Sequence, residues 1–266
     1  MKDQLKLMAI MAHPDDESLG IGGTLAKYAA EGVEVTLLTA TRGERGWQRT
    51  DAPNPGLEAL GQVRQAELYE ASKILGLREV CFLDFIDGDL DAAAPAKAIQ
   101  PIVAHLRRVR PQVVVTWSPD GGYGHPDHIA TCQFATAAVL CAADPLYASG
   151  TGQPHRIDKL YYIALTQMRA ELYAKAFGDE PFPVDGVDRH SAPIPDWEVT
   201  TRLDAYDYWQ TVWQAAQCHR SQLDGLTKRF LDEELRMLWG LQTFYRVFSL
   251  VNGGRALEND LFEGLR

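Results

Sequence analysis

The chain has 266 residues, of which 46% are hydrophobic and 23% are charged, and its formal net charge is −10. This length suits one large α/β domain or two smaller ones, and the composition is typical of a folded globular protein. The acidic balance disfavours nonspecific binding to nucleic acid or to an anionic membrane surface, because both partners are negatively charged.

Cysteine usage and the N-terminal residues bear on the cellular compartment. The cysteines at positions 81, 132, 141 and 218 form no Cys-x-x-Cys pair, so neither a disulfide framework nor a thiolate metal site is predicted. We interpret them as reduced thiols of a cytoplasmic protein. Lys2 and Lys6 precede an apolar run that is too short for the core of an export signal. No apolar stretch approaches the ~20 residues of a membrane span.

Strands and helices are predicted to alternate along the first half of the chain. Apolar and β-branched runs are typical of buried strands. Pro126 favours a helix start and Gly76 a helix end. Strands are expected at about Leu5–Ala12, Val33–Thr39, Val80–Leu83 and Val113–Trp117, and helices at about Ser18–Ala30, Gly61–Leu75, Ala96–Arg108 and Pro126–Ala143.

The second half of the chain has a less regular pattern. The segment Gly178–Trp197 holds four prolines and several acids, which predicts a long loop or lid. Further strands are expected at about Lys159–Leu165 and Tyr245–Leu250, and helices at about Ala205–His219 and Phe230–Trp239. The alternation predicts an α/β fold with a mostly parallel sheet covered on both faces. Because no linker divides the chain, a single domain over residues 1–266 is expected.

Two clusters of metal-binding side chains follow predicted strands. His13-Pro14-Asp15-Asp16-Glu17 forms the turn after the first strand, and Tyr123-Gly124-His125-Pro126-Asp127-His128 leads into the helix after the fourth. Both turns are expected at the carboxyl edge of the parallel sheet, where α/β folds bind ligands. A shared cation would remove the repulsion among these side chains, since Asp, Glu and neutral His are all metal ligands. We therefore predict that the two turns bind one metal ion.

The types of donor favour a catalytic site. Two imidazoles and one carboxylate with an open fourth position are typical of catalytic zinc, and they also suit Fe²⁺. His125 and His128 lie three residues apart at a helix start, where such side chains share a face. Beyond three ligands, one imidazole and one carboxylate remain. A spare carboxylate can take a proton from the attacking water, and a spare imidazole can donate a proton or stabilise an oxyanion.

Simpler interpretations apply to single residues of these turns. An Asp before a helix is often only an N-cap, which would explain Asp15 or Asp16. We interpret Asp127 as no more than an acid near the helix N-terminus, favourable to the helix dipole. Capping requires neither His13 nor a second His-Pro-Asp-His turn at the same edge, so the metal site is the favoured hypothesis.

The motifs Ala12-His13-Pro14-Asp15-Asp16-Glu17 and Gly124-His125-Pro126-Asp127-His128 strongly resemble those of the PIG-L/LmbE-like family of zinc-dependent N-acetylglucosaminyl deacetylases. Weaker similarity extends over most of the chain, at Thr41–Glu44, Arg64, Asp87-Gly88 and Cys218–Gln222. The resemblance implies a Rossmann-like, three-layer LmbE-like fold. It also implies a hydrolase that removes the N-acetyl group from a small molecule containing N-acetylglucosamine. Relatives often assemble, so the resemblance also allows a homo-oligomer.

The resemblance further implies roles for residues of the two turns. It implies that Zn²⁺ is held by His13, Asp16 and His128. Asp15 would be the general base that activates the water. His125 would be the acid or the electrostatic partner of the tetrahedral intermediate, and Tyr123 would help to polarise the amide carbonyl.

Three substrate contacts are also implied, at Glu44, Arg64 and Asp87. Two of them have simpler alternatives of equal standing. For Arg64 the alternative is a surface ion pair with Glu67 or Glu70, and for Asp87 it is a plain Asp-Gly turn.

Other side chains near the predicted turns have weaker signals. We interpret Glu17 as a second layer of support or a helix start, and His219 as a core or solvated histidine. Of Trp47, Trp117 and Trp197, at most one is expected to stack on a sugar, because most tryptophans are packing residues. The C-terminal part, about residues 166–266, is expected to contribute the lid and the substrate pocket.

Two alternative functions remain open on the sequence alone. The same scaffold can hydrolyse another small-molecule amide, as a thiol-conjugate amidase or an antibiotic-tailoring deacylase, because the motifs build the reaction centre and not the pocket. A nucleotide-binding module without catalysis is disfavoured. Its first turn would need glycines whose N–H groups face phosphate, whereas Gly20, Gly22 and Gly23 come too late and lack the spacing.

Overall fold

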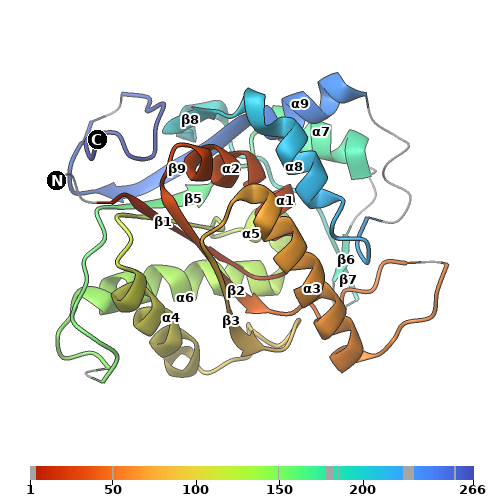
Figure 1. Ribbon diagram of the computed structural model, residues 1–266, viewed down its shortest axis with the longest axis horizontal. Coiled ribbons are helices and arrows are strands. Elements are labelled where there is room, and N and C mark those ends of the chain that lie inside the picture. Colours follow the sequence, from red (N-terminus) through yellow and green to blue (C-terminus); the bar gives the residue numbers. More distant parts are fainter. Residues whose placement is uncertain are drawn as a thin grey trace.

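The computed structural model describes residues 4–49, 51–148, 150–177, 182–184, 186–223, 231–254 and 256–266. Its centre is a seven-stranded sheet in the order β3-β2-β1-β4-β5-β9-β8, with helices on both faces (Figure 1). β1 to β5 are parallel, and β9 and β8 continue the sheet antiparallel. This mostly parallel, three-layer arrangement confirms the predicted fold class.

The strands of the main sheet are β1 (Lys6–Met11), β2 (Glu34–Thr41), β3 (Glu79–Phe85), β4 (Val113–Thr116), β5 (Lys159–Ile163), β8 (Thr201–Asp204) and β9 (Leu241–Ser249). A separate hairpin pairs β6 (Phe182–Val184) with β7 (Val187–Arg189). The helices are α1 (Asp16–Leu19), α2 (Gly22–Ala30), α3 (Leu57–Leu75), α4 (Pro95–Val109), α5 (Gly121–Gly124), α6 (Pro126–Ala143), α7 (Gln167–Phe177), α8 (Trp209–Ala216) and α9 (Asp232–Gly240), with 3₁₀ turns η1 (Asp196–Glu198) and η2 (Tyr206–Tyr208).

Two apolar cores hold the layers together. On one face, Leu25 of α2, Leu68 of α3 and Ala215 of α8 pack with the sheet. On the other, Ile102 of α4 and Ala135 of α6 do so. The strands between them are buried on both faces, so β1 is continuously apolar from Leu7 to Met11 and β4 from Val113 to Val115, without alternation.

Most of the first half follows the expected boundaries, although α3 begins at Leu57 and not at Gly61, and α5 was not predicted. The single helix expected at Ser18–Ala30 is divided into α1 and α2. The break lies tightly against C-terminal elements: a Cβ on Gly22 would come within 2.8 Å of Val212, and one on Gly23 within 2.5 Å of the Trp239 carbonyl oxygen. Glycines here allow α8 and α9 to approach the turn that follows β1.

The C-terminal half differs more from the expectation. α7 and β8 were not predicted. The expected loop Gly178–Trp197 contains the β6–β7 hairpin and η1, although residues 178–181 and 185 lie outside the described part of the chain. The helix expected at Ala205–His219 is shorter, because η2 precedes α8. Phe230, the expected start of the last helix, also lies outside the described residues.

The sheet topology determines where a ligand can bind. β1 and β4 are adjacent and parallel, with Ile10 opposite Thr116. The chain leaves β1 toward β2 on one side and β4 toward β5 on the other, so the strand order reverses between them. Ligands of open α/β sheets bind outside the carboxyl ends of the strands at such a point.

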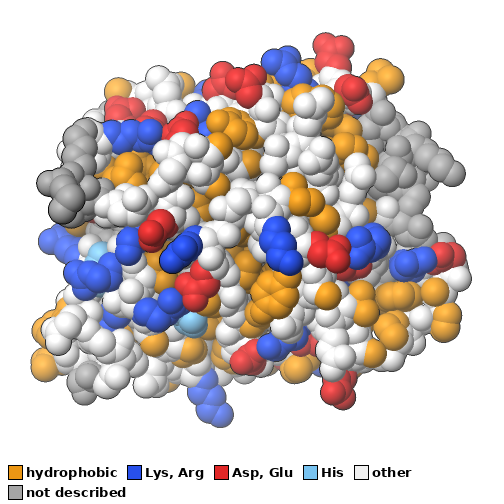
Figure 2. Space-filling view, in the orientation of Figure 1, with side chains coloured by type: hydrophobic (Ala, Val, Ile, Leu, Met, Phe, Trp, Pro, Cys, Tyr) orange, Lys and Arg blue, Asp and Glu red, His pale blue; other side chains and the backbone are white. Residues whose placement is uncertain are grey.

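The surface charges and the lengths of the helices bear on binding to a polyanion or a bilayer. On the face shown in Figure 2, acidic and basic side chains are interspersed rather than gathered into one basic field. Among the described residues, no helix combines the length and the apolar character needed to cross a bilayer.

A buried charge cluster ties the C-terminal segment to the sheet. Glu258 accepts hydrogen bonds from Lys159 Nζ at 2.7 Å and from the hydroxyls of Tyr161 and Thr201 at 2.8 Å each. Its side chain and that of Lys159 are fully buried, and Arg246 lies 2.8 Å away. Burial alone would raise the pKa of Glu258, but these hydrogen bonds outweigh it and lower the pKa to about 2.

Glu258→Gln is expected to lower the free energy of unfolding by about 3–5 kcal/mol, because it leaves buried positive charge without its counter-ion. Since the folded-state pKa lies below the unfolded value of about 4.3, this stabilisation is complete above about pH 4.3 and is lost as pH falls toward 2. Denaturant unfolding at pH 7 and pH 3 measures both effects. Glu79→Gln, which breaks an exposed pair with Arg108, should cost less than about 1 kcal/mol. An equal loss in both variants would refute the prediction.

Candidate active site

The two turns predicted to share a metal lie together at the carboxyl edge of the sheet. His13 follows β1, Asp16 begins α1, and His128 lies in the first turn of α6. Ligand atoms of these three buried residues all lie within 4.8 Å of one another. Residues more than a hundred positions apart therefore form one cluster.

The separations within this cluster fit a tetrahedral metal. Nδ1 of His13 lies 3.2 Å from Nε2 of His128, which lies 3.4 Å from Oδ1 of Asp16. Metal–ligand bonds of about 2.0–2.1 Å at tetrahedral angles place ligand atoms about 3.3–3.4 Å apart. Two buried ring nitrogens this close need a cation or a proton between them. The donor set and its spacing therefore suit a divalent ion.

Hydrogen bonds from the far side of each ring leave the inner nitrogens available. Nδ1 of His128 donates to the Gly121 carbonyl oxygen at 3.1 Å, which leaves the Nε2 lone pair free. Nε2 of His13 faces Oδ1 of Asp87 at 3.1 Å and Oδ2 of Asp127 at 3.2 Å. A carboxylate on the outer nitrogen of a metal-binding histidine fixes its tautomer and orientation.

Three hydrogen bonds from neighbouring N–H groups orient the Asp16 carboxylate through its Oδ2 atom. Its Oδ2 accepts hydrogen bonds from the Ala12 and His13 amides at 3.0 and 2.9 Å and from Trp117 Nε1 at 3.2 Å. Oδ1 is thus turned toward His128. Burial would raise the pKa of Asp16, but the facing His128 and His13 hold it well below its usual range, so the carboxylate is ionised.

Two supporting residues have functions that the sequence did not reveal. Asp127, interpreted from sequence as only a dipole partner, is fully buried and accepts from the Gly88 and Leu90 amides at 2.7 and 3.1 Å while facing His13. The interpretation of Asp127 as a dipole partner alone was wrong. The sequence did contain a signal for its importance, because the tripeptide His-Pro-Asp occurs in both turns. Trp117 stacks on His128, with ring centroids 4.0 Å apart. Its ring therefore supports the His128 ring and is not placed to stack on a sugar.

Asp127→Asn is expected to weaken metal affinity by about 10- to 100-fold, because it removes a charged partner of the His13 ring. Chelator competition on the purified protein measures the effect. Asp196→Asn, at an exposed aspartate paired with Arg202, serves as the control and should leave affinity unchanged. Equal affinity in both variants would show that Asp127 does not orient the ligand.

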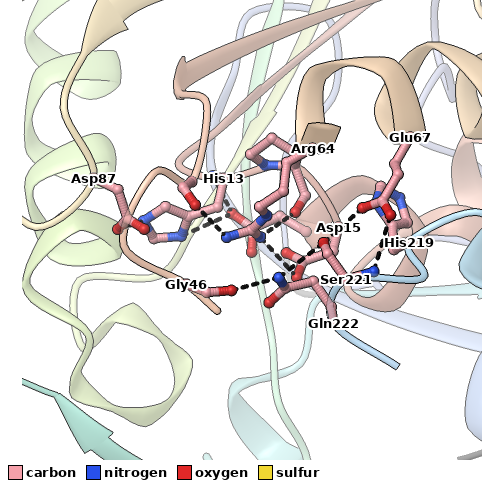
Figure 3. Close-up of polar contacts among 12 residues, drawn as sticks. His13, Asp15, Gly46, Arg64, Glu67, Asp87, His219, Ser221 and Gln222 are labelled. Atoms are coloured by element: carbon pink, nitrogen blue, oxygen red, sulfur yellow. Dashed lines mark hydrogen bonds and ion pairs between the residues drawn. The ribbon is translucent and has the colours of Figure 1, made fainter. Parts of the chain in front are cut away.

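Asp15 has an unusual backbone beside the candidate metal ligands. Its φ is 116°, and a residue with a side chain pays of order 1–3 kcal/mol for such a conformation. Arg64 Nη2 donates to the Pro14 carbonyl oxygen at 2.6 Å and to Oδ2 of Asp15 at 3.1 Å (Figure 3). Burial raises the pKa of Asp15 to about 6 despite the opposing charge of Arg64. A carboxylate with that pKa suits a general base near neutral pH.

His125 and Tyr123 lie around the same rings. The His125 ring centroid is 4.7 Å from that of His13 and 4.8 Å from that of His128. His125 caps α6: its Nδ1 accepts from the Asp127 amide at 3.1 Å, so Nε2 carries the proton. Burial, with His13 and His128 nearby, lowers its pKa to about 3. Burial and the nearby acids raise the pKa of Tyr123, so its hydroxyl stays protonated.

The three expected substrate contacts also converge on this region, and each is buried. Oε2 of Glu44 accepts from the Asp87 amide at 3.1 Å, and Asp87 faces His13. Arg64 is 3% exposed and binds the Asp15 turn. The alternative of a surface ion pair with Glu67 or Glu70 is wrong, because those acids bind Ser221 and Arg220 instead.

The comparisons with known proteins agree with this geometry. Residues 8–139 match the family described as PIG-L, GlcNAc-PI de-N-acetylase. A 1D-myo-inositol 2-acetamido-2-deoxy-alpha-D-glucopyranoside deacetylase of Nocardioides sp. is 34% identical over 98% of both chains, and one of Streptomyces avermitilis is 35% identical over 100% of this chain and 99% of the relative. The solved N,N'-diacetylchitobiose deacetylase of Pyrococcus horikoshii has a TM-score of 0.68 at 20% identity, covering 92% of this chain and 84% of its own.

Proposed function

This chain belongs to the PIG-L family of de-N-acetylases, and we propose that it hydrolyses the acetamide of N-acetylglucosamine linked to a cyclitol such as myo-inositol. The observation that carries the proposal is similarity at 34–35% identity over essentially the whole length of deacetylases named for that substrate. The similarity thus includes the C-terminal part as well as the two metal-binding turns. Non-catalytic nucleotide binding is set aside, because the chain is an amide-bond hydrolase.

The proposed cofactor is a single Zn²⁺ held by His13, Asp16 and His128. The supporting observation is the spacing of their ligand atoms. Fe²⁺ is the alternative that the same donor set admits. When bound, the ion would supply Lewis-acid chemistry: it would lower the pKa of water, so that the water can lose a proton and act as a nucleophile near neutral pH.

The remaining residues of the site are assigned to proton transfer and charge stabilisation. The Asp15 carboxylate accepts the proton of the attacking water and passes it to the amine nitrogen as the C–N bond breaks, so the products are acetate and the free amine. The N–H at Nε2 of His125 and the hydroxyl of Tyr123 donate hydrogen bonds to the oxyanion of the tetrahedral intermediate. The neutral state of His125 favours this electrostatic role over that of an acid.

Glu44, Arg64 and Asp87 are proposed to contact the sugar, because they line the Asp15 and His13 side of the cluster. The chain is proposed to be one domain, in which residues after about 166 help to form the pocket. Support comes from the β7 segment: Arg189 Nη1 donates to the Gly124 carbonyl oxygen at 2.7 Å, beside Tyr123 and His125. The four free cysteines agree with a cytoplasmic site of action.

Amine release from a panel of amides tests the proposal. The metal-loaded protein is assayed with N-acetylglucosaminyl-inositol, free N-acetylglucosamine, N,N'-diacetylchitobiose and a thiol-conjugate amide. The amounts of acetate and of free amine released are both measured. We expect the inositol glycoside to have the highest kcat/KM, with one acetate per amine. Cleavage of the conjugate without cleavage of any N-acetylglucosaminide would support the alternative amidase instead.

A further inference from the structure

A buried acid and a buried histidine lie beneath the catalytic turn and are used by none of the steps above. The side chains of Glu17 and His219 are both fully buried, and His219 Nε2 lies 2.8 Å from Oε1 of Glu17. Ser18 Oγ donates to the same oxygen at 2.5 Å. Neither Glu17 nor His219 belongs to the proposed ligand set. Burying a carboxylate costs free energy unless it is paired. A buried pair beside the site therefore calls for a structural or functional explanation.

The second oxygen of Glu17 holds the backbone of Asp15. Oε2 accepts a hydrogen bond from the Asp15 amide at 2.9 Å. On the other side of Asp15, its carbonyl oxygen accepts from the Ser18 and Leu19 amides at 3.0 and 2.8 Å. Asp15 is thus bound on both sides of the bond whose φ is 116°. Strained backbone persists only where its surroundings hold it in this way.

The residues that follow His219 are hydrogen-bonded to other parts of the site and so hold the histidine in place. The Ser221 amide and hydroxyl donate to Glu67 of α3 at 2.9 and 2.6 Å. Gln222 Nε2 donates to the Gly46 carbonyl oxygen at 2.5 Å. Figure 3 shows this segment beside Asp15 and Arg64. Nδ1 of His219 has no partner among the described residues, so the ring is held through Nε2.

We propose that Glu17 and His219 are positioning residues for the reaction: the pair holds Asp15 in its left-handed backbone conformation and so aims the carboxylate at the attacking water. Arg64 fixes the Asp15 side chain from one direction, and the pair fixes the backbone from the other. Misplacement of a catalytic group by about 1 Å can cost about 10²-fold in rate. The inference rests on the proposed function in that Asp15 is taken as the base.

The test compares His219→Leu with His219→Gln, which keeps an N–H donor toward Glu17. We expect His219→Leu to lower kcat by about 10- to 100-fold with KM and zinc content close to those of the wild type, and His219→Gln to recover most of the loss. His155→Leu is the matched control, because the His155 ring is also buried and is likewise held through Nε2, which bonds to the Pro111 carbonyl oxygen at 2.7 Å. It should destabilise the fold without changing kcat.

A crystal structure of the His219→Leu variant gives a readout that does not depend on turnover. We expect Asp15 to relax to negative φ. Retained positive φ, or kcat within twofold of the wild type in the folded, metal-loaded variant, would overturn the inference. If the Leu variant does not fold, Glu17→Ala, which removes the acceptor of the Asp15 amide, decides on the same two measurements. Inactivity of the wild type toward every amide would instead refute the proposed function, and the φ measurement would still test the pair.

Discussion

Asp15→Asn is expected to lower kcat by about 10²- to 10⁴-fold, the usual contribution of a positioned general base. Asparagine has the same shape, and its carbonyl oxygen can still accept the hydrogen bond that Arg64 donates at 3.1 Å. It cannot accept the proton of the attacking water. Steady-state kinetics on protein with measured zinc content isolates this effect, because Asp15 is not one of the proposed ligands.

The control for Asp15 is Asp144→Asn, at an exposed aspartate at the opposite end of α6 from His128. It should leave kcat unchanged. The Asn variant at position 15 should keep the same KM within a few-fold and the same zinc content. Near-wild-type turnover in that variant would remove Asp15 as the base, and a parallel loss of zinc would show that it acts through the metal instead.

His128→Ala is expected to abolish stoichiometric metal binding and to lower kcat/KM by at least about 10³-fold. The metal supplies several kcal/mol of charge stabilisation, and each 1.36 kcal/mol is a factor of ten in rate. The variant also removes the ring on which Trp117 stacks, so thermal unfolding must be measured beside zinc content.

His155→Ala separates loss of the ligand from loss of a buried ring, because His155 is buried but lies outside the cluster. It should lower the melting temperature and keep one metal ion per chain. If His128→Ala retained a full complement of zinc, the three-ligand assignment would be refuted whatever happened to the rate.

The first half of the fold could be predicted because its elements are determined locally. Gly76 ends α3 with φ of 77°, as expected from its residue type, and Pro126 begins α6 where its missing N–H costs nothing. β1 and β4 are buried on both faces, so their apolar runs needed no further context. The division between α1 and α2 could not be foreseen, because it depends on the approach of Val212 and Trp239.

The second half could not be predicted because its elements depend on distant partners. β8 has four residues, and its partner β9 follows only after α8 and α9. Its sequence, Thr201–Asp204, has too few residues for a periodic signal. The hairpin of β6 and β7 contains Pro183, which argues against a strand in a sequence but is tolerated in a short two-stranded ribbon.

The candidate site follows the same division between local and distant information. Residue type and spacing suffice to predict that the two turns would meet, since each follows a strand at one sheet edge. The choice of His13, Asp16 and His128 among their side chains came from the family resemblance. The supporting layer is different. Asp127 faces His13 across 114 positions, and His219 reaches Glu17 across 202. The repeated His-Pro-Asp marks Asp127 as a candidate, but no local pattern names its partner or the partner of His219, so only the folded chain shows these pairs.

The most direct test of the proposed zinc site is anomalous X-ray scattering from crystals of the purified, active protein, with data collected on both sides of the zinc absorption edge. We predict one zinc peak per chain, bonded to Nδ1 of His13, Nε2 of His128 and Oδ1 of Asp16. A peak elsewhere with none among these three atoms, or full amine release by protein stripped of metal, would contradict the account.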